Sequence, residues 1–100
     1  MDFNAIKTMY DNENAKGAIG MLLIVWAPGT HKPPDQYIPI YGKNFVADAE
    51  IEFQRTLQRR NNGLQVKDQL SREDFKVNGP TTNKLSLPTI TYTKTAIRSA

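Results

Sequence analysis

The chain has 100 residues, with 13 basic and ten acidic side chains, a formal net charge of +3 and no cysteine. A chain of this length forms one small compact unit, so we expect a single domain over residues 1–100. Leu, Ile, Val and Phe make up 23 of the 100 residues, above the ~20% below which a charged chain is expected to remain disordered. The lack of cysteine excludes disulfide frameworks, thiolate metal sites and a cysteine nucleophile.

Charge is distributed unevenly along the chain. Residues 1–53 contain four lysines and seven acids, whereas residues 54–100 contain nine basic residues and three acids. All five arginines lie in the second half. Such asymmetry indicates an interaction with an oppositely charged surface. The alternative is that the two halves fold against each other and neutralise their charges locally, and the sequence leaves both open.

The first elements are a helix and a buried strand. Asp2 can cap a short helix in which Phe3, Ile6 and Tyr10 share one face. Residues 18–26 form a continuous apolar run, typical of a strand that is buried on both faces. The run has nine residues, far fewer than the ~20 that span a bilayer as a helix. We therefore expect no membrane partner, and a location in the cytoplasm or within a virus particle.

An extended arm is expected next, over residues 27–42. Residues 27–35 contain three prolines and a glycine, which predicts a stiff loop. Residues 36–42 place Tyr37 and Tyr41 in phase, while Pro39 removes a hydrogen-bond donor from any ladder. This pattern is typical of an edge strand or an extended arm.

Residues 45–60 fit two structures. Alternation places Phe45, Ile51, Phe53 and Leu57 on one strand face, so the periodicity favours a strand. Composition favours a helix, since Ala, Glu, Gln, Leu and Arg are good helix formers and Ala, Asp and Glu are depleted in strands. The strand gains support from Asn62-Gly63, the pair that a two-residue hairpin turn requires. We favour the strand, and keep a helix as the alternative.

The rest of the chain predicts a capped turn and a terminal strand. Ser71 and Asp74 have the spacing of a capping box, which predicts a helix of one or two turns. A C-terminal strand is expected within residues 85–98, with a face of alternating threonines from Thr89 to Thr95. Together these elements predict an α+β, sheet-rich fold: a short N-terminal helix and a mostly antiparallel sheet with a long hairpin around Asn62-Gly63. The alternative is that residues 45–60 form a helix packed on the sheet.

No group of residues points to catalysis. His31 is the only histidine and lies in the proline-rich loop, without a second imidazole or a thiolate to share a metal. On a strand, Asp48, Glu50 and Glu52 would line one face and could hold a hard cation, although such a row is usually a solvated face. We therefore expect no enzyme, no cofactor, no metal site and no small-molecule substrate.

The candidate contacts are basic and aromatic. Four basic side chains would gather near the hairpin tip and contact nucleic-acid phosphates or a protein partner, namely Arg55, Arg59, Arg60 and Lys67. Alternatively, their aliphatic stems cover apolar surface while the charged groups stay in water. The candidate interface residues are Tyr37, Tyr41 and Tyr92.

The leading functional hypothesis is a non-enzymatic structural or assembly subunit. A small core, a stiff arm and a protruding hairpin are typical of a component that other protein subunits complete by strand pairing. The subunit would belong to a larger homo- or hetero-oligomeric particle, such as a virus or phage. The alternative is a nucleic-acid-binding module that uses the basic hairpin.

Overall fold

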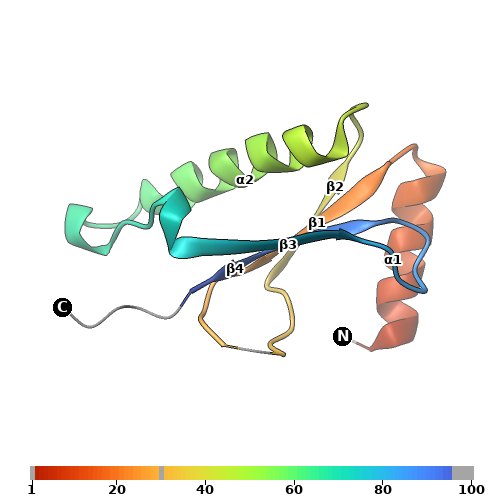
Figure 1. Cartoon of the computed structure of the whole chain (residues 1–100), viewed down its shortest axis with the longest axis horizontal. Coiled ribbons are helices and arrows are strands. Elements are labelled where there is room, and N and C mark those ends of the chain that lie inside the picture. Colours follow the sequence, from red (N-terminus) through yellow and green to blue (C-terminus); the bar gives the residue numbers. More distant parts are fainter. Residues whose placement is uncertain (1, 30, 96–100) are drawn as a thin grey trace.

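A computed structural model describes residues 2–29 and 31–95. It contains a four-stranded sheet in the order β2-β1-β4-β3, formed by β1 (Gly20–Val25), β2 (Gln36–Ile40), β3 (Phe75–Thr81) and β4 (Thr89–Lys94). Two helices accompany the sheet, α1 (Phe3–Ala15) and α2 (Phe45–Asn61), together with the single 3₁₀ turns η1 (Val66–Asp68) and η2 (Arg72–Asp74). Figure 1 shows α2 lying along one face of the sheet and α1 crossing one end of it.

The apolar strand β1 lies in the middle of the sheet. It pairs with β2 antiparallel and with β4 parallel, and β4 pairs with β3 antiparallel. Leu22 and Ile24 pack in the core cluster under α2, whereas Met21 and Leu23 pack in the cluster that contains α1. Successive side chains of a strand point to opposite faces, so β1 is buried on both. The expected α+β, sheet-rich fold with a short N-terminal helix is confirmed.

The expectation of a strand over residues 45–60 is wrong, and so is the hairpin around Asn62-Gly63. Residues 45–61 form helix α2, which Asn44 caps by accepting a hydrogen bond from the backbone N–H of Ala47. The alternative, a helix packed on the sheet, is correct. Its buried stripe consists of Ala49, Phe53 and Leu57, at helical spacing. Helix propensity prevailed because this stripe, with Phe45 packed beside it, covers the sheet while Val46 and Ile51 stay exposed.

Both edge strands carry features that hinder pairing with another strand. Pro39 lies within β2. An edge strand can accommodate it, because proline has no N–H to donate to a second neighbouring strand. In β3 the register shifts between Asn78 and Thr81, next to Pro80, and Lys76 places a charge on the edge. Prolines, bulges and lysines are the devices by which proteins prevent edge-to-edge association. The sheet edges therefore offer poor templates for a partner strand.

The second face of the sheet is only partly covered. Helix α1 packs there over a cluster built on Tyr10, Ala18, Met21 and Leu87. Further along β4, Thr91 and Thr93 are only partly buried. The loop that joins β1 to β2 lies on this side of the sheet, beyond the reach of α1 (Figure 1). Within the described ranges, neither helix is long and apolar enough to cross a membrane.

Candidate nucleic-acid interface

A groove of about 690 Å³ occupies the part of the sheet that α1 leaves open. Its floor and walls come from β1, β3, β4 and the loop between β1 and β2. The described residues that line it are Val25, Gly29, His31, Lys32, Pro34, Lys76, Asn78, Thr91, Thr93, Lys94 and Thr95. The groove thus combines residues from three distant parts of the chain.

The groove is basic and rich in hydrogen-bond donors. Lys32, Lys76 and Lys94 are among the described lining residues, and no carboxylate is found there. Lys76 pairs with Thr93 and shares its face of the sheet, whereas Lys94 follows Thr93 in β4 and therefore directs its side chain to the α2 face, with only its backbone side toward the groove. Over residues 2–29 and 31–95, none of these lysines forms an ion pair with an acid. Between them lie the hydroxyl groups of Thr91 and Thr93. The groove therefore presents positive charge and neutral polar groups to an anion.

This chemistry suits phosphate groups better than bases. Lysine binds phosphate as a point charge, and threonine hydroxyls donate hydrogen bonds to phosphate oxygens. Among the described lining residues, His31 contributes the one aromatic ring, an imidazole, and no Phe, Tyr or Trp is found, so the groove offers little surface for base stacking. The groove can bind a phosphate backbone without regard to its sequence.

The basic residues predicted from the sequence lie elsewhere. Without the hairpin they do not gather at a tip, and Arg55, Arg59 and Arg60 instead extend from α2. Arg55 forms an ion pair of 2.7 Å with Glu52 on the preceding turn. The guanidinium of Arg60 lies over the ring of Trp26, 4.3 Å from its centroid. Lys67 is exposed on η1.

Arg59 and Arg60 share a second pocket with Trp26. It lies on the α2 side of the sheet, has a volume of about 730 Å³ and also contains the carboxylates of Asp35 and Glu52. The structure thus brings two of the predicted arginines together, but beside acids and an aromatic ring. This pocket is therefore mixed in charge, whereas the basic groove has no acid among its described lining residues.

The three predicted interface tyrosines have different surroundings. Tyr41 is 50% exposed, and its hydroxyl donates a hydrogen bond to Glu13 on α1. Tyr37 is partly buried against the α1 cluster. Tyr92 is only 2% exposed and stacks on Phe53 with ring centroids 4.2 Å apart. Tyr92 is a core residue, so its predicted place at an interface is corrected.

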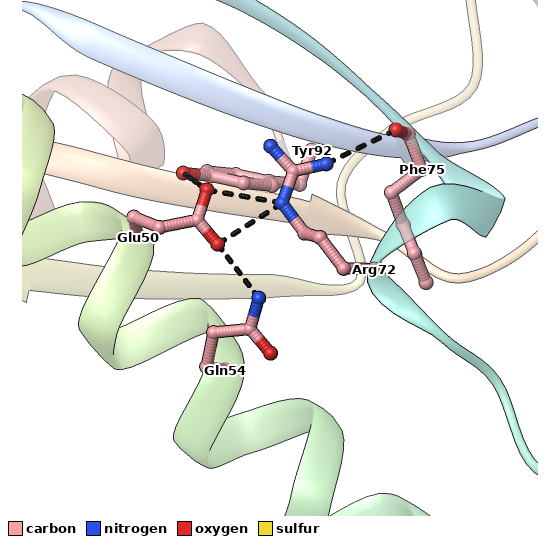
Figure 2. Close-up of polar contacts among 5 residues, drawn as sticks. All are labelled: Glu50, Gln54, Arg72, Phe75 and Tyr92. Carbon is pink, nitrogen blue, oxygen red and sulfur yellow. Dashed lines mark hydrogen bonds and ion pairs between the residues drawn. The ribbon is translucent and has the colours of Figure 1, made fainter.

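Glu50 is the centre of a polar network beneath α2 (Figure 2). Arg72 Nε donates to both Glu50 carboxylate oxygens at 3.0 Å, and Arg72 Nη1 donates to the Phe75 carbonyl at 3.3 Å. The Tyr92 hydroxyl and the Gln54 amide also donate to Glu50, at 3.2 and 2.9 Å. Burial, with the nearby Glu50 carboxylate and this hydrogen bond, raises the pKa of Tyr92 to about 12. The network joins α2 to η2 and β4.

The row of carboxylates considered for a cation does not exist on the helix. Glu50 binds Arg72 and Glu52 binds Arg55, while Asp48 lines a third pocket beside Tyr41. Residues two apart on a helix do not share a face. Among the described residues, no group of three or more His, Asp or Glu side chains is placed to hold a metal ion.

The lysines that line the basic groove escaped the sequence analysis, which identified only His31, the proline-rich loop and the threonine face of β4 among its parts. Lys32 lies in a loop and Lys76 in an edge strand, and neither belongs to a cluster in the sequence. Comparison with known proteins finds no matching family model, no matching curated protein and no matching solved structure. Functional inference therefore depends on the geometry of this chain.

Proposed function

We propose that the protein is a non-enzymatic nucleic-acid-binding module whose basic groove binds a phosphate backbone. The observation that carries the proposal is the convergence of Lys32 and Lys76 with the hydroxyl groups of Thr91 and Thr93 on an open sheet face, without an acid among the described lining residues. Neutralisation of phosphates by lysine releases condensed counterions, which is the main source of sequence-independent affinity. The cytoplasm and the interior of a virus particle, the two proposed locations, both contain such ligands.

Binding to a fluorescently labelled 20-nucleotide strand at low salt tests the proposal. We expect the double variant Lys32→Ala, Lys76→Ala to lose most of its affinity in an anisotropy titration. The matched control removes two lysines outside the groove, by Lys7→Ala and Lys43→Ala. It changes the net charge equally but leaves the groove intact, so affinity should fall far less. Equal losses in both variants, or no binding by the unmodified protein, would refute the proposed site.

An assembly subunit is the second candidate function. The segment between α2 and η2 projects from one end of the molecule (Figure 1), and on it Val66 is 84% and Leu64 39% exposed. Apolar side chains presented in this way gain free energy when a protein partner covers them, about 25 cal/mol per Å². The blunted edges of β2 and β3 favour such a side-chain contact over strand pairing.

Light scattering on the purified chain tests this second candidate. A self-assembling subunit should form a defined oligomer, and Val66→Asp should shift it to the monomer without a change in the circular dichroism spectrum. The exposed residue Gln58 on α2 provides the control, since Gln58→Asp adds the same charge elsewhere. A strict monomer at high concentration would contradict self-assembly.

A further inference from the structure

We propose that the pocket around Trp26 binds a nucleobase of the same strand, stacked on the indole ring, with Arg59 and Arg60 beside its phosphate. This inference rests on the proposed nucleic-acid binding and adds a base-contacting site to the phosphate-binding groove. The pocket is lined by Trp26, Asp35, Gln36, Thr56, Arg59 and Arg60, among others, and its volume is about 730 Å³.

The indole ring is held in place from several sides. The Trp26 backbone N–H donates to Asp35 Oδ2 at 2.8 Å, and its ring Nε1 donates to Gln36 Oε1 at 2.7 Å. Phe75 meets the ring edge to face, with centroids 5.7 Å apart. A partly buried ring that is fixed in this way presents a preformed platform, which loses little freedom when a ligand stacks on it.

One face of this platform is covered by a replaceable group. The Arg60 guanidinium lies 4.3 Å from the ring centroid, but Arg60 is exposed and belongs to the last turn of α2. A base can take its place over the indole, because every base has a π face that stacks on an aromatic ring. The displaced guanidinium, together with Arg59, then lies where it can bind the phosphate of the same nucleotide.

The pocket also offers polar partners for the edge of a base. Asp35 uses Oδ2 for the Trp26 N–H, which leaves Oδ1 to accept a hydrogen bond from an exocyclic amino group. Glu52 lines the same pocket and can accept likewise. These carboxylates would be unfavourable beside a phosphate alone, so they indicate a ligand with donors as well as charge.

The pocket and the basic groove lie back to back at one end of the sheet. Val25 and Pro34 line the groove, whereas the next residues along the chain, Trp26 and Asp35, line the pocket. A strand that passes over the β1 to β2 loop reaches both sites. In a duplex the bases are paired and stacked inside the helix, so the ligand of both sites is single-stranded.

The only tryptophan of the chain provides a direct signal for the test. Three probes are titrated at low salt: a single-stranded 12-nucleotide deoxycytidine oligomer, an abasic oligomer of equal length, and cytidine monophosphate. We expect the oligomer to quench Trp26 fluorescence and to bind about tenfold more tightly than the abasic strand, from the stacking of one base. Anisotropy of end-labelled strands measures affinity independently of tryptophan.

Variants separate the base site from the groove. Trp26→Ala should bind the normal and the abasic oligomer equally, and Trp26→Phe, which keeps a ring in the core, should retain part of the preference. The double groove variant Lys32→Ala, Lys76→Ala should weaken the binding of both strands by the same factor. Circular dichroism confirms that each variant is folded, and the more conservative Trp26→Phe keeps the test valid if Trp26→Ala unfolds.

Each outcome has a distinct meaning. Equal affinity for normal and abasic strands, without quenching, overturns the base site and leaves the phosphate-binding groove intact. Quenching by cytidine monophosphate, with no tighter binding of the oligomer, supports a base site for a free nucleotide and contradicts the strand. No binding of any probe overturns both proposals.

Discussion

Arginine residues of this chain have roles that depend on their surroundings. Arg72 binds Glu50 and the Phe75 carbonyl, and lies 5.8 and 5.3 Å from the ring centroids of Phe53 and Tyr92. Arg55 binds Glu52 on the same helix, with 60% of its side chain exposed. Both glutamates belong to α2. Arg72 nevertheless contacts several groups besides its glutamate, whereas Arg55 forms a polar contact only with Glu52 among the described residues.

Replacement of Arg72 should cost more stability than replacement of Arg55. Arg72→Ala leaves Glu50 without its cation and the Phe75 carbonyl without a donor, and we expect a loss of about 1–2 kcal/mol in the free energy of unfolding. Arg55→Ala removes an exposed pair one turn apart and should cost less than about 0.5 kcal/mol. Urea denaturation compares the two. Equal losses of unfolding free energy in the two variants would show that the network at Glu50 adds no stability beyond that of an exposed ion pair.

The stability of the protein should fall at high pH through Tyr92. Its pKa of about 12 in the fold exceeds the ~10 of an unfolded tyrosine, so folding favours the protonated hydroxyl. This contribution is complete below pH ~10 and is lost as the pH rises through ~12, a loss of up to about 3 kcal/mol. Burial raises the pKa of Tyr10 as well, so the decline has two sources.

The substitution Tyr92→Phe separates the titration of the Tyr92 hydroxyl from that of Tyr10. The variant should be less stable near pH 8, because it lacks the hydrogen bond to Glu50, but its stability should decline less steeply above pH 10. Urea midpoints at several pH values between 8 and 11.5 measure the difference. Parallel pH profiles for the variant and the unmodified protein would contradict the raised pKa.

At the scale of elements, α2 is where the periodicity and the propensity of the sequence disagreed. On a strand, Ile51 and Leu57 would share one buried face. On α2, Leu57 is buried in the core whereas Ile51 is 50% exposed. Alternation at period two arose because apolar residues lie on both sides of the helix, and only one side packs on the sheet.

Paired substitutions on α2 test this assignment. Leu57→Ala should reduce the free energy of unfolding by about 2–4 kcal/mol, through lost burial and a cavity. Ile51→Ala should change it by less than about 0.5 kcal/mol, since the side chain is exposed and alanine favours helix. Thermal or urea unfolding provides the measurement. A large loss from Ile51→Ala would indicate that this face of α2 is buried.

At the scale of the whole molecule, the two halves of the chain neutralise each other only in part. Arg72 of the basic second half pairs with Glu50 of the acidic first half. Lys76, also from the second half, meets Lys32 from the first in a groove whose described lining contains no acid. Folding has therefore concentrated positive charge on one face rather than dispersing it.

Binding to a single strand should accordingly depend on salt. With two phosphates neutralised in the groove, the logarithm of the association constant should fall with the logarithm of the salt concentration with a slope of about −1.4 or steeper. Each single replacement, such as Lys76→Ala, should reduce the steepness by about 0.7. Arg55→Ala should leave the slope unchanged, because the Arg55 guanidinium is already paired with the Glu52 carboxylate and lies outside the groove. A slope near zero would contradict phosphate contacts.

Several local features followed from the sequence because their causes are local. The apolar run of β1, the proline that places β2 at an edge, the capping box at Ser71 and the alternation of β4 each depend on neighbouring residues. The long apolar run also predicted that β1 is buried on both faces. The α+β class could thus be inferred without any long-range contact.

The candidate sites depended on contacts that no local pattern records. Lys32 and Lys76 are far apart in the sequence, and they meet only because β4 pairs with both β1 and β3 while the β1 to β2 loop lies against the same face. Similarly, Arg60 reaches Trp26 only because α2 is a helix on the opposite face. The sequence by itself determined the elements and their apolar faces. Tertiary structure alone decided which charges converge, because side-chain convergence follows from strand order and helix placement.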